Sequence, residues 1–127
     1  MSERMDPEIK KEWLEDLRSG KIPQGKGCLG KDTGERCCLG VLCDIAVEHK
    51  VIKPATVDDY RGDLIYDECR SLLPQSVRDF GWPGGILDSV QIDEITDRGT
   101  GYILSLADMN DKGFTFSQIA DVIEYFL

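Results

Sequence analysis

The sequence predicts a small, mainly α-helical α+β domain, with about five short helices around one core and a minor β-hairpin. Apolar residues recur at helical spacing near both ends of the chain, and an apolar run occupies the middle. Two short segments rich in β-branched and aromatic residues flank a polar turn. The chain has 127 residues, of which 41% are hydrophobic and 31% charged. This size and composition predict one folded domain over residues 1–127.

The first helix is predicted to begin at Asp6-Pro7, an N-cap residue followed by proline at the first helical position. Ile9, Trp13 and Leu17 then recur every four residues and define its buried stripe. Ser19-Gly20 ends it, because glycine is favoured just past a helix C-terminus. Trp13 is interpreted as a core residue.

The second helix is predicted from Cys37 to Glu48 and is apolar on nearly every side. Cys38 and Cys43 are interpreted as small core residues. Gly40 lowers helix stability by roughly 1 kcal/mol relative to alanine. Close packing against another helix would explain why a glycine is found there.

The remaining elements are shorter. Thr56-Val57 and Leu64–Tyr66 flank the polar segment Asp58–Asp63 and predict the hairpin. Further expected elements are a helix over Pro74–Phe80, an irregular turn at residues 82–85, an extended piece including Val90, Ile92 and Ile95, a turn at residues 97–101 and a helix over Tyr102–Met109. The last helix follows a capping box, Thr115-Phe-Ser-Gln118, and carries Ile119, Val122, Ile123 and Phe126 on one stripe.

Charge and cysteine content limit the possible functions. The net charge of −9 argues against general binding to nucleic acid or anionic membranes, which require a positive field. The N-terminal residues lack the apolar region of a secretory signal, and the longest apolar run is too short to span a bilayer. Five cysteines, an odd number, are best interpreted as reduced thiols in a cytosolic protein.

A glycine-rich basic loop, residues 21–36, connects the first two predicted helices. Its letters GKGCLGKD approach the phosphate-binding pattern GxxxxGK[ST], but Asp32 replaces the magnesium-binding hydroxyl and no buried strand precedes it. Five basic and two acidic residues between Arg18 and Arg36 still give this region a local net charge of +3. The predicted anion-binding residues, which form the candidate site, are Gln24, Lys26, Lys31 and Arg36. An ordinary solvated loop is the alternative.

No residue pattern predicts catalysis, a metal site or a cofactor. The cysteines form no C-x-x-C pair, and their spacings do not match a structural zinc site. Cys28 is expected to be the exposed thiol because it lies in the glycine-rich loop. His49, the single histidine, is expected to cap a helix end rather than to activate a nucleophile. The loop around Asn110 lacks the carboxylates of a calcium site, and the adjacent acidic pairs are typical of solvated surface.

Several segments in this order resemble a group of small proteins encoded by tailed bacteriophages. The most specific is Cys37-Cys-Leu-Gly-Val-Leu-Cys43, and the match spans nearly the whole chain. The resemblance implies a phage origin and expression in the host cytoplasm, and it transfers no catalytic residue. The other matching residues are Trp13-Leu14, Leu17, Ser19–Lys21, Gln24-Gly25, Asp44, Leu73-Pro74, Leu106–Asp111, Gly113, Phe116, Ile119-Ala120 and Ile123.

Together these observations predict a non-enzymatic viral accessory protein that binds and modulates a host factor, in one setting as a counter-defence protein. The alternative is a protein that binds or sequesters a small nucleotide-like anion through the basic loop, alone or as an oligomer. An enzyme would need a pocket containing Cys28, His49 or a carboxylate pair. The expected partners are therefore a host protein or a small anionic ligand, with no nucleic acid, membrane or cofactor.

Overall fold

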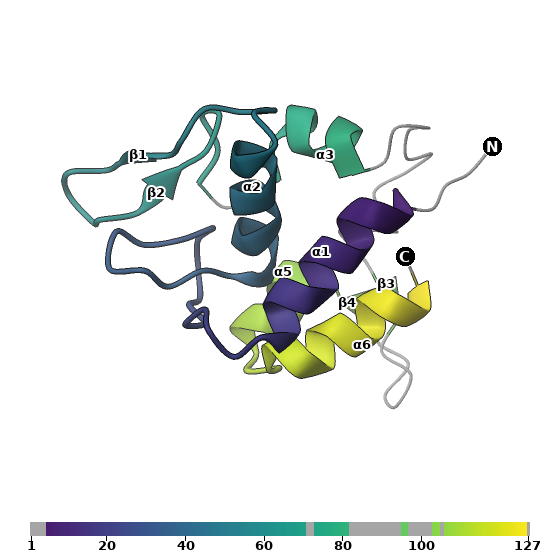
Figure 1. Cartoon of the computed structure of the whole chain (residues 1–127). Helices are drawn as coiled ribbons and strands as arrows, with labels where there is room; N and C mark the ends of the chain where they lie inside the picture. Colours follow the sequence, from purple (N-terminus) through teal and green to yellow (C-terminus); the bar gives the residue numbers. More distant parts are fainter. Residues whose placement is uncertain (1–4, 71–72, 82–94, 97–102, 105, 127) are drawn as a thin grey trace.

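The computed structural model describes residues 5–70, 73–81, 95–96, 103–104 and 106–126. Within them it is a small α+β fold with five helices and a β-hairpin, as predicted, and a second antiparallel strand pair that was not predicted (Figure 1). None of the described helices is long and apolar enough to cross a membrane. The helices are α1 (Pro7–Arg18), α2 (Cys38–Glu48), α3 (Gln75–Gly81), α5 (Leu106–Asp111) and α6 (Phe116–Phe126). The strands are β1 (Thr56–Val57), β2 (Leu64–Ile65), β3 (Ile95–Thr96) and β4 (Ile103–Leu104).

Helix α1 forms as its sequence predicts. The Asp6 carboxylate accepts hydrogen bonds from the Glu8 and Ile9 amides at 2.9 and 3.3 Å, which satisfies two free donors of the first turn. At the other end, Gly20 takes a φ of 74° just past the C-cap. Trp13 is fully buried, and its Nε1 donates to the Cys38 carbonyl oxygen at 2.9 Å. Helix α1 thus packs on α6 and on the start of α2 (Figure 1).

Helix α2 is the centre of the core, with eight of its eleven residues buried, Cys38 and Cys43 among them. The expectation that another helix packs closely against Gly40 is wrong. The backbone that lies against Gly40 belongs to Leu29 in the glycine-rich loop, and a Cβ built on Gly40 would lie 1.8 Å from the Leu29 carbonyl oxygen. Glycine is needed because this loop, rather than a second helix, crosses α2 at contact distance.

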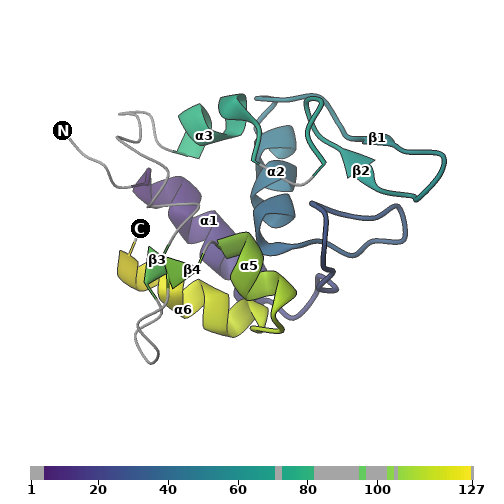
Figure 2. The same ribbon diagram turned by 180° about the vertical axis from the view of Figure 1, so that it is seen from behind.

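The predicted hairpin is present, and the glycine-rich loop extends it. Thr56 pairs with Ile65 and Val57 with Leu64. On the other side of β2, Lys31 forms an antiparallel bridge with Asp63, and the Leu64 amide donates to the Gly30 carbonyl at 2.9 Å. The order across this small sheet is therefore β1, β2 and the loop segment Gly30-Lys31, and β1 lies at an edge (Figures 1 and 2).

The C-terminal third differs in part from expectation. The helix predicted over Tyr102–Met109 is wrong in its first half, because Ile103–Leu104 forms β4 and pairs with β3. A short apolar run is compatible with either state, and Ile95–Thr96 supplies the strand partner. Helix α5 occupies Leu106–Asp111 instead. Val90, Ile92 and the turns expected at residues 82–85 and 97–101 lie outside the described residues.

The other predicted helices are confirmed. Helix α3 begins and ends one residue later than expected. The capping box forms in both directions. The Thr115 amide donates to Gln118 Oε1 at 2.9 Å, and the Gln118 amide donates to Thr115 Oγ1 at 3.1 Å. Ile119 and Ile123 of α6 are fully buried against the core.

Candidate functional site

The glycine-rich loop, residues 21–36, is folded by its own backbone. The Gly25 amide donates to the Arg36 carbonyl at 2.8 Å, and the Arg36 amide donates to Pro23 at 2.9 Å. Farther along, the Leu29 amide donates to the Arg70 carbonyl at 2.6 Å. Amides that already donate to carbonyl oxygens cannot also cradle an anion. The loop is therefore built primarily as a structural connection between α1, α2 and the hairpin.

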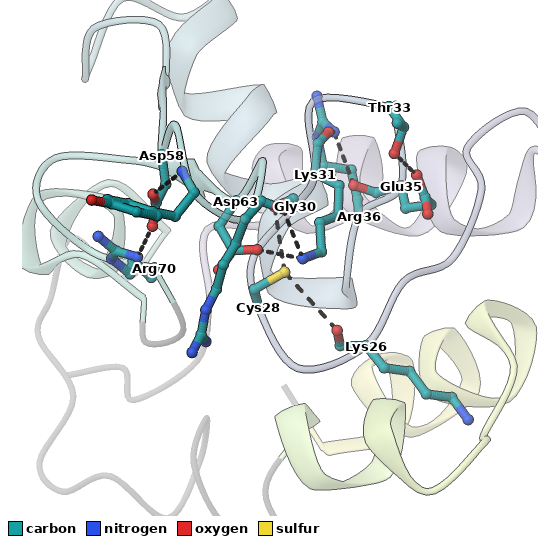
Figure 3. Close-up of polar contacts among 12 residues, drawn as sticks. Lys26, Cys28, Gly30, Lys31, Thr33, Glu35, Arg36, Asp58, Asp63 and Arg70 are labelled. Atoms are coloured by element: carbon teal, nitrogen blue, oxygen red, sulfur yellow. Dashed lines mark hydrogen bonds and ion pairs between the residues drawn. The ribbon is translucent and has the colours of Figure 1, made fainter.

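Two of the four predicted anion-binding residues are paired with carboxylates of the chain. Lys31 Nζ forms an ion pair with Asp63, whose side chain is almost completely buried (Figure 3). The hydrogen bond from Lys31 holds the pKa of Asp63 below its ordinary value. Arg36 Nε binds Asp44 Oδ2 at 2.7 Å, and its Nη1 donates to the Lys31 and Glu35 carbonyls at 3.1 and 2.9 Å. The Lys31 and Arg36 side chains therefore already form ion pairs within the fold.

The other two predicted residues lie apart from that pair. Gln24 Nε2 donates to Asn110 Oδ1 at 2.9 Å and to the Phe114 carbonyl at 2.7 Å, so its amide holds the loop to the α5–α6 joint. Lys26 is exposed and forms no ion pair with a described residue. Its side chain extends away from Lys31 (Figure 3). The four predicted residues therefore do not converge on one point in this structure.

Asn110 is a buried polar residue that sequence reasoning missed. It is completely buried, and its Oδ1 also accepts the Cys38 amide at 3.2 Å, while its Nδ2 donates to the Gly25 carbonyl at 2.6 Å. A single side chain thus joins the loop, the first turn of α2 and the end of α5. Its position in an Asn-Asp-Lys-Gly turn indicated only a loop residue, because nothing in the sequence shows burial there.

A second buried network surrounds Tyr66. Its hydroxyl donates to Asp44 Oδ1, and Arg36 binds the other oxygen of the same carboxylate at 2.7 Å. Tyr66 is 1% exposed. Burial, and then the hydrogen bond to Asp44, raise the pKa of Tyr66 far above its ordinary value. The phenol stays protonated, so this network fixes the hairpin to α2 and does not supply an acid or base.

The thiols are not arranged for chemistry. Cys28, Cys37, Cys38 and Cys43 are buried, which corrects the expectation that Cys28 is exposed, and Cys69 is the most accessible of the five. Burial raises the pKa of Cys37 to about 11 and raises the pKa of Cys28 as well. A protonated, buried thiol is a poor nucleophile. No group of three metal-ligating side chains occurs among the described residues.

His49 is the C-cap residue of α2, as expected. Its Nε2 lies 2.9 Å from Glu12 Oε2, and its ring packs at 5.2 Å from the ring of Phe80. It therefore connects the end of α2 to α1 and α3. Within the described part of the chain, these contacts with Glu12 and Phe80 include no cysteine, and they are those of a residue that holds helix ends together.

Among the described residues, the hairpin turn presents an exposed aromatic side chain. Tyr60 is 96% exposed, by far the most exposed large hydrophobic residue of the described chain. The turn beneath it is tightly held. The Tyr60 amide donates to Asp58 Oδ1 at 2.8 Å, and Asp58 forms an ion pair with Arg70 (Figure 3). The hydrogen bond from the Tyr60 amide has the larger effect, and together with the contact to Arg70 it holds the pKa of Asp58 below its ordinary value.

The glycine-rich loop supports the same turn from behind. Gly62 takes a φ of 72°, and a Cβ there would lie 2.7 Å from Asp32 Oδ1. The Asp32 amide donates to the Gly62 carbonyl at 2.8 Å. Asp32, which stands where the phosphate-binding pattern requires Ser or Thr, thus helps to hold the turn in place. We call residues 58–62 the hairpin tip.

An open groove of about 800 Å³ lies beside the hairpin, between the end of α2 and the start of α3. The three non-glycine residues with positive φ in the described chain, Lys50, Asp67 and Glu68, all line it. Val51 and Ile65 contribute apolar surface. Lysines and carboxylates therefore both border this groove, so it presents no single charge to a ligand.

Sequence reasoning identified the turn but not its exposed aromatic residue. The run Asp58-Asp-Tyr-Arg-Gly62 indicates a polar connection, and a tyrosine within it is equally compatible with a ring folded onto the core. The contacts of Asp58 with Arg70 and of Gly62 with Asp32 involve residues distant in sequence. No local pattern could have revealed them.

Comparison with known proteins identifies a family. Residues 5–127 match the model of a protein family described as "Domain of unknown function (DUF8296)". No curated protein and no solved structure matches the chain significantly.

Proposed function

The chain belongs to the DUF8296 family, and we propose that it is a non-enzymatic binding protein that docks onto a host protein and modulates it. In this proposal it is a viral accessory protein of a tailed bacteriophage that acts in the host cytoplasm. The hairpin tip is the docking element, and Tyr60 is its anchor.

The exposure of Tyr60 carries the proposal. A tyrosine that is 96% exposed contributes almost no hydrophobic burial to its own fold. Tyrosines are enriched among the residues that dominate binding energy at protein interfaces. Because Asp58, Arg70 and Asp32 already hold the turn, little additional backbone entropy is lost when a partner buries the ring.

The remaining chemistry favours binding over catalysis. Four thiols are buried, and the Tyr66 phenol is held protonated. Lys31 and Arg36 are neutralised by carboxylates of the chain itself. Buried thiols, the Tyr66 phenol, Lys31 and Arg36 are therefore occupied by structural contacts, whereas Lys26 and Cys69 remain accessible.

The net charge of −9 indicates the kind of host surface that fits. A partner with a basic face would be attracted at long range, and its association rate would fall as salt screens the charges. Asp59 and Arg61 flank Tyr60 at the tip, and both are exposed. We infer that the partner offers an apolar pocket for the ring within a predominantly basic surface.

The alternative function, binding of a small nucleotide-like anion, now depends mainly on Lys26. This lysine is exposed, and its Nζ lies 3.9 Å from the position that a Cβ on Gly113 would occupy. Binding that is unchanged by Lys26→Ala would exclude this alternative. An anion site that also used Lys31 and Arg36 would have to replace their ion pairs with Asp63 and Asp44.

The proposal is tested by affinity capture from a lysate of the bacterial host, followed by mass spectrometry. We compare the wild type with Tyr60→Ala and with Lys11→Ala, a control at an exposed position on α1. We expect a protein that the wild type and Lys11→Ala capture and Tyr60→Ala does not. Equal capture by all three variants would contradict the proposed docking element.

A further inference from the structure

The groove beside the hairpin has the size of a ligand site. Its volume of about 800 Å³ lies within the range of pockets that hold small organic ligands. It is bordered by residues 50–54, which connect α2 to β1, and by the turn residues 67–68 after β2. These two segments lie side by side in both views (Figures 1 and 2). Thr56 and Ile65, which pair across the hairpin, line the groove from the sheet.

Four charged side chains line the groove without neutralising one another. Lys50 and Lys53 belong to the connection, and Asp67 and Glu68 belong to the turn. None of the four forms an ion pair with a described residue. Asp67 Oδ2 accepts a hydrogen bond from Ser76 Oγ at 2.8 Å, a neutral donor that leaves the carboxylate charge in place. Both signs of charge are therefore available to a ligand that carries both.

The turn holds its two carboxylates in an unfavourable backbone conformation. Tyr66 and Cys69 exchange two backbone hydrogen bonds, at 2.9 and 2.8 Å. Between them, Asp67 and Glu68 have φ angles of 48° and 69°. A two-residue hairpin loop with positive φ at both positions is a type I′ turn, in which Asn-Gly is strongly preferred. Local stability therefore does not explain why two acidic residues are found here.

Lys50 occupies a comparable position on the other side of the groove. It follows the C-cap of α2 with a φ of 63°, where glycine is favoured. Lys50, Asp67 and Glu68 are the non-glycine residues with positive φ in the described chain, and all three line this groove. Residues held in sparsely populated backbone regions concentrate at sites that clamp ligands. The charges of these side chains thus have a use in binding that offsets their conformational cost.

We propose that the groove binds a short peptide of a few residues with free ends. The peptide carboxylate lies toward the two lysines, its ammonium group lies toward the two turn carboxylates, and its apolar side chains contact Val51, Pro54 and Ile65. A single amino acid also carries both charges but fills only a small part of this volume. A nucleotide or another polyanion is disfavoured, because the turn carboxylates repel it. The inference is independent of the host protein proposed to dock on Tyr60.

The test is a nuclear magnetic resonance titration of the isotope-labelled protein with a synthetic mixture of free-ended tripeptides and tetrapeptides, up to about 5 mM. We expect saturable shifts of the Val51, Lys53 and Glu68 amides. Matched mixtures with an acetylated amino end or an amidated carboxyl end should bind at least about tenfold more weakly, and so should free amino acids. Unshifted amides throughout the titration, or equal binding of the capped mixtures, overturn the proposal.

A variant of the turn separates binding from folding. Asp67→Asn with Glu68→Gly introduces the preferred type I′ pair, so it should raise the melting temperature by about 3–5 °C. The same variant should bind free-ended peptides at least about tenfold more weakly than the wild type, because it removes both carboxylates. A more stable variant that binds these peptides as tightly as the wild type overturns the proposal.

Three single variants complete the experiment. Lys53→Met keeps the apolar stem and should reduce the preference for a free carboxyl end, while the preference for a free amino end remains. Lys11→Ala changes an exposed position on α1, outside the groove, and should bind peptides as the wild type does. Tyr60→Ala should also retain peptide binding, so failure of this site and failure of the host-docking proposal are distinguishable. A preference for free ends that Lys53→Met leaves wholly unchanged contradicts the assigned orientation of the peptide.

Discussion

Gly40→Ala gives the sharpest test of how the glycine-rich loop is packed. In an ordinary helix interior this substitution stabilises by about 1 kcal/mol, because alanine has the higher helix propensity. Here the new Cβ would lie 1.8 Å from the Leu29 carbonyl oxygen and 2.8 Å from its carbonyl carbon. Restoring normal contact requires a shift of roughly 1.5 Å in the Leu29 backbone. We therefore expect Gly40→Ala to destabilise the protein rather than to stabilise it.

The size of the destabilisation follows from the packing and the hydrogen bonds that a shift of the Leu29 backbone would disturb. The Leu29 carbonyl accepts the Cys37 amide at 3.0 Å, and the Leu29 amide donates to Arg70 at 2.6 Å. Overpacking of a dense core costs about 1–3 kcal/mol, and one weakened hydrogen bond costs about 1 kcal/mol. After subtraction of the propensity gain, Gly40→Ala should lower the free energy of unfolding by about 1–3 kcal/mol.

Urea unfolding followed by circular dichroism measures this difference. Gly81→Ala is the matched control, because Gly81 is also buried and helical, yet among the described residues a Cβ there meets only the flexible end of Met5 at 3.4 Å. The control should change the free energy of unfolding by less than about 1 kcal/mol. A Gly40→Ala variant as stable as the wild type, or more stable, would refute the close approach of Leu29 to α2.

Three other predictions concern stability and thiol reactivity. Asn110→Ala removes the hydrogen bonds of a completely buried side chain to the Gly25 carbonyl and the Cys38 amide, so it should cost about 2–4 kcal/mol in urea unfolding; a loss below about 1 kcal/mol would contradict its bridging role. Because the pKa of Asp63 is lowered in the fold, the unfolded chain takes up its proton first, and stability falls as pH drops below about 5. Asp63→Asn should therefore be less stable than wild type at pH 7 and lose less stability toward pH 3, whereas parallel curves would contradict the ion pair. Cys69, the least buried thiol, should account for the fast phase of labelling by a disulfide reagent, and a fast phase that survives Cys69→Ser would disprove this.

The sequence predicted those elements whose signals are local. Asp6-Pro7 fixes the start of α1, and the reciprocal Thr115–Gln118 pair fixes the start of α6. The apolar run after Cys37 is long enough to be interpreted as a buried helix. In each case the residues that stabilise the element lie within four positions of one another, so periodicity and capping rules apply directly.

The glycine-rich loop shows why the rest was not predictable. Its glycine-rich sequence suggests a flexible loop, but hydrogen bonds to residues distant in sequence hold it in place. The Leu29 amide donates to the Arg70 carbonyl, the Leu64 amide donates to the Gly30 carbonyl, and the Gly27 amide donates to Asp111 Oδ1 at 2.9 Å. Basic residues likewise looked free in the sequence because their carboxylate partners lie farther along the chain. Strand β4 was missed for a different reason, because Ile103–Leu104 belongs to a short apolar run that is compatible with a helix or a strand.

The most direct test of the account is the affinity of the captured host protein for Tyr60 variants. Titration calorimetry compares the wild type, Tyr60→Phe and Tyr60→Ala, with circular dichroism as the check that each is folded. If the exposed ring is the anchor, Tyr60→Ala weakens binding by about 30-fold or more, equivalent to about 2 kcal/mol, and Tyr60→Phe retains most of the affinity. A Tyr60→Ala variant that binds as tightly as the wild type contradicts the proposal that the hairpin tip is the docking element.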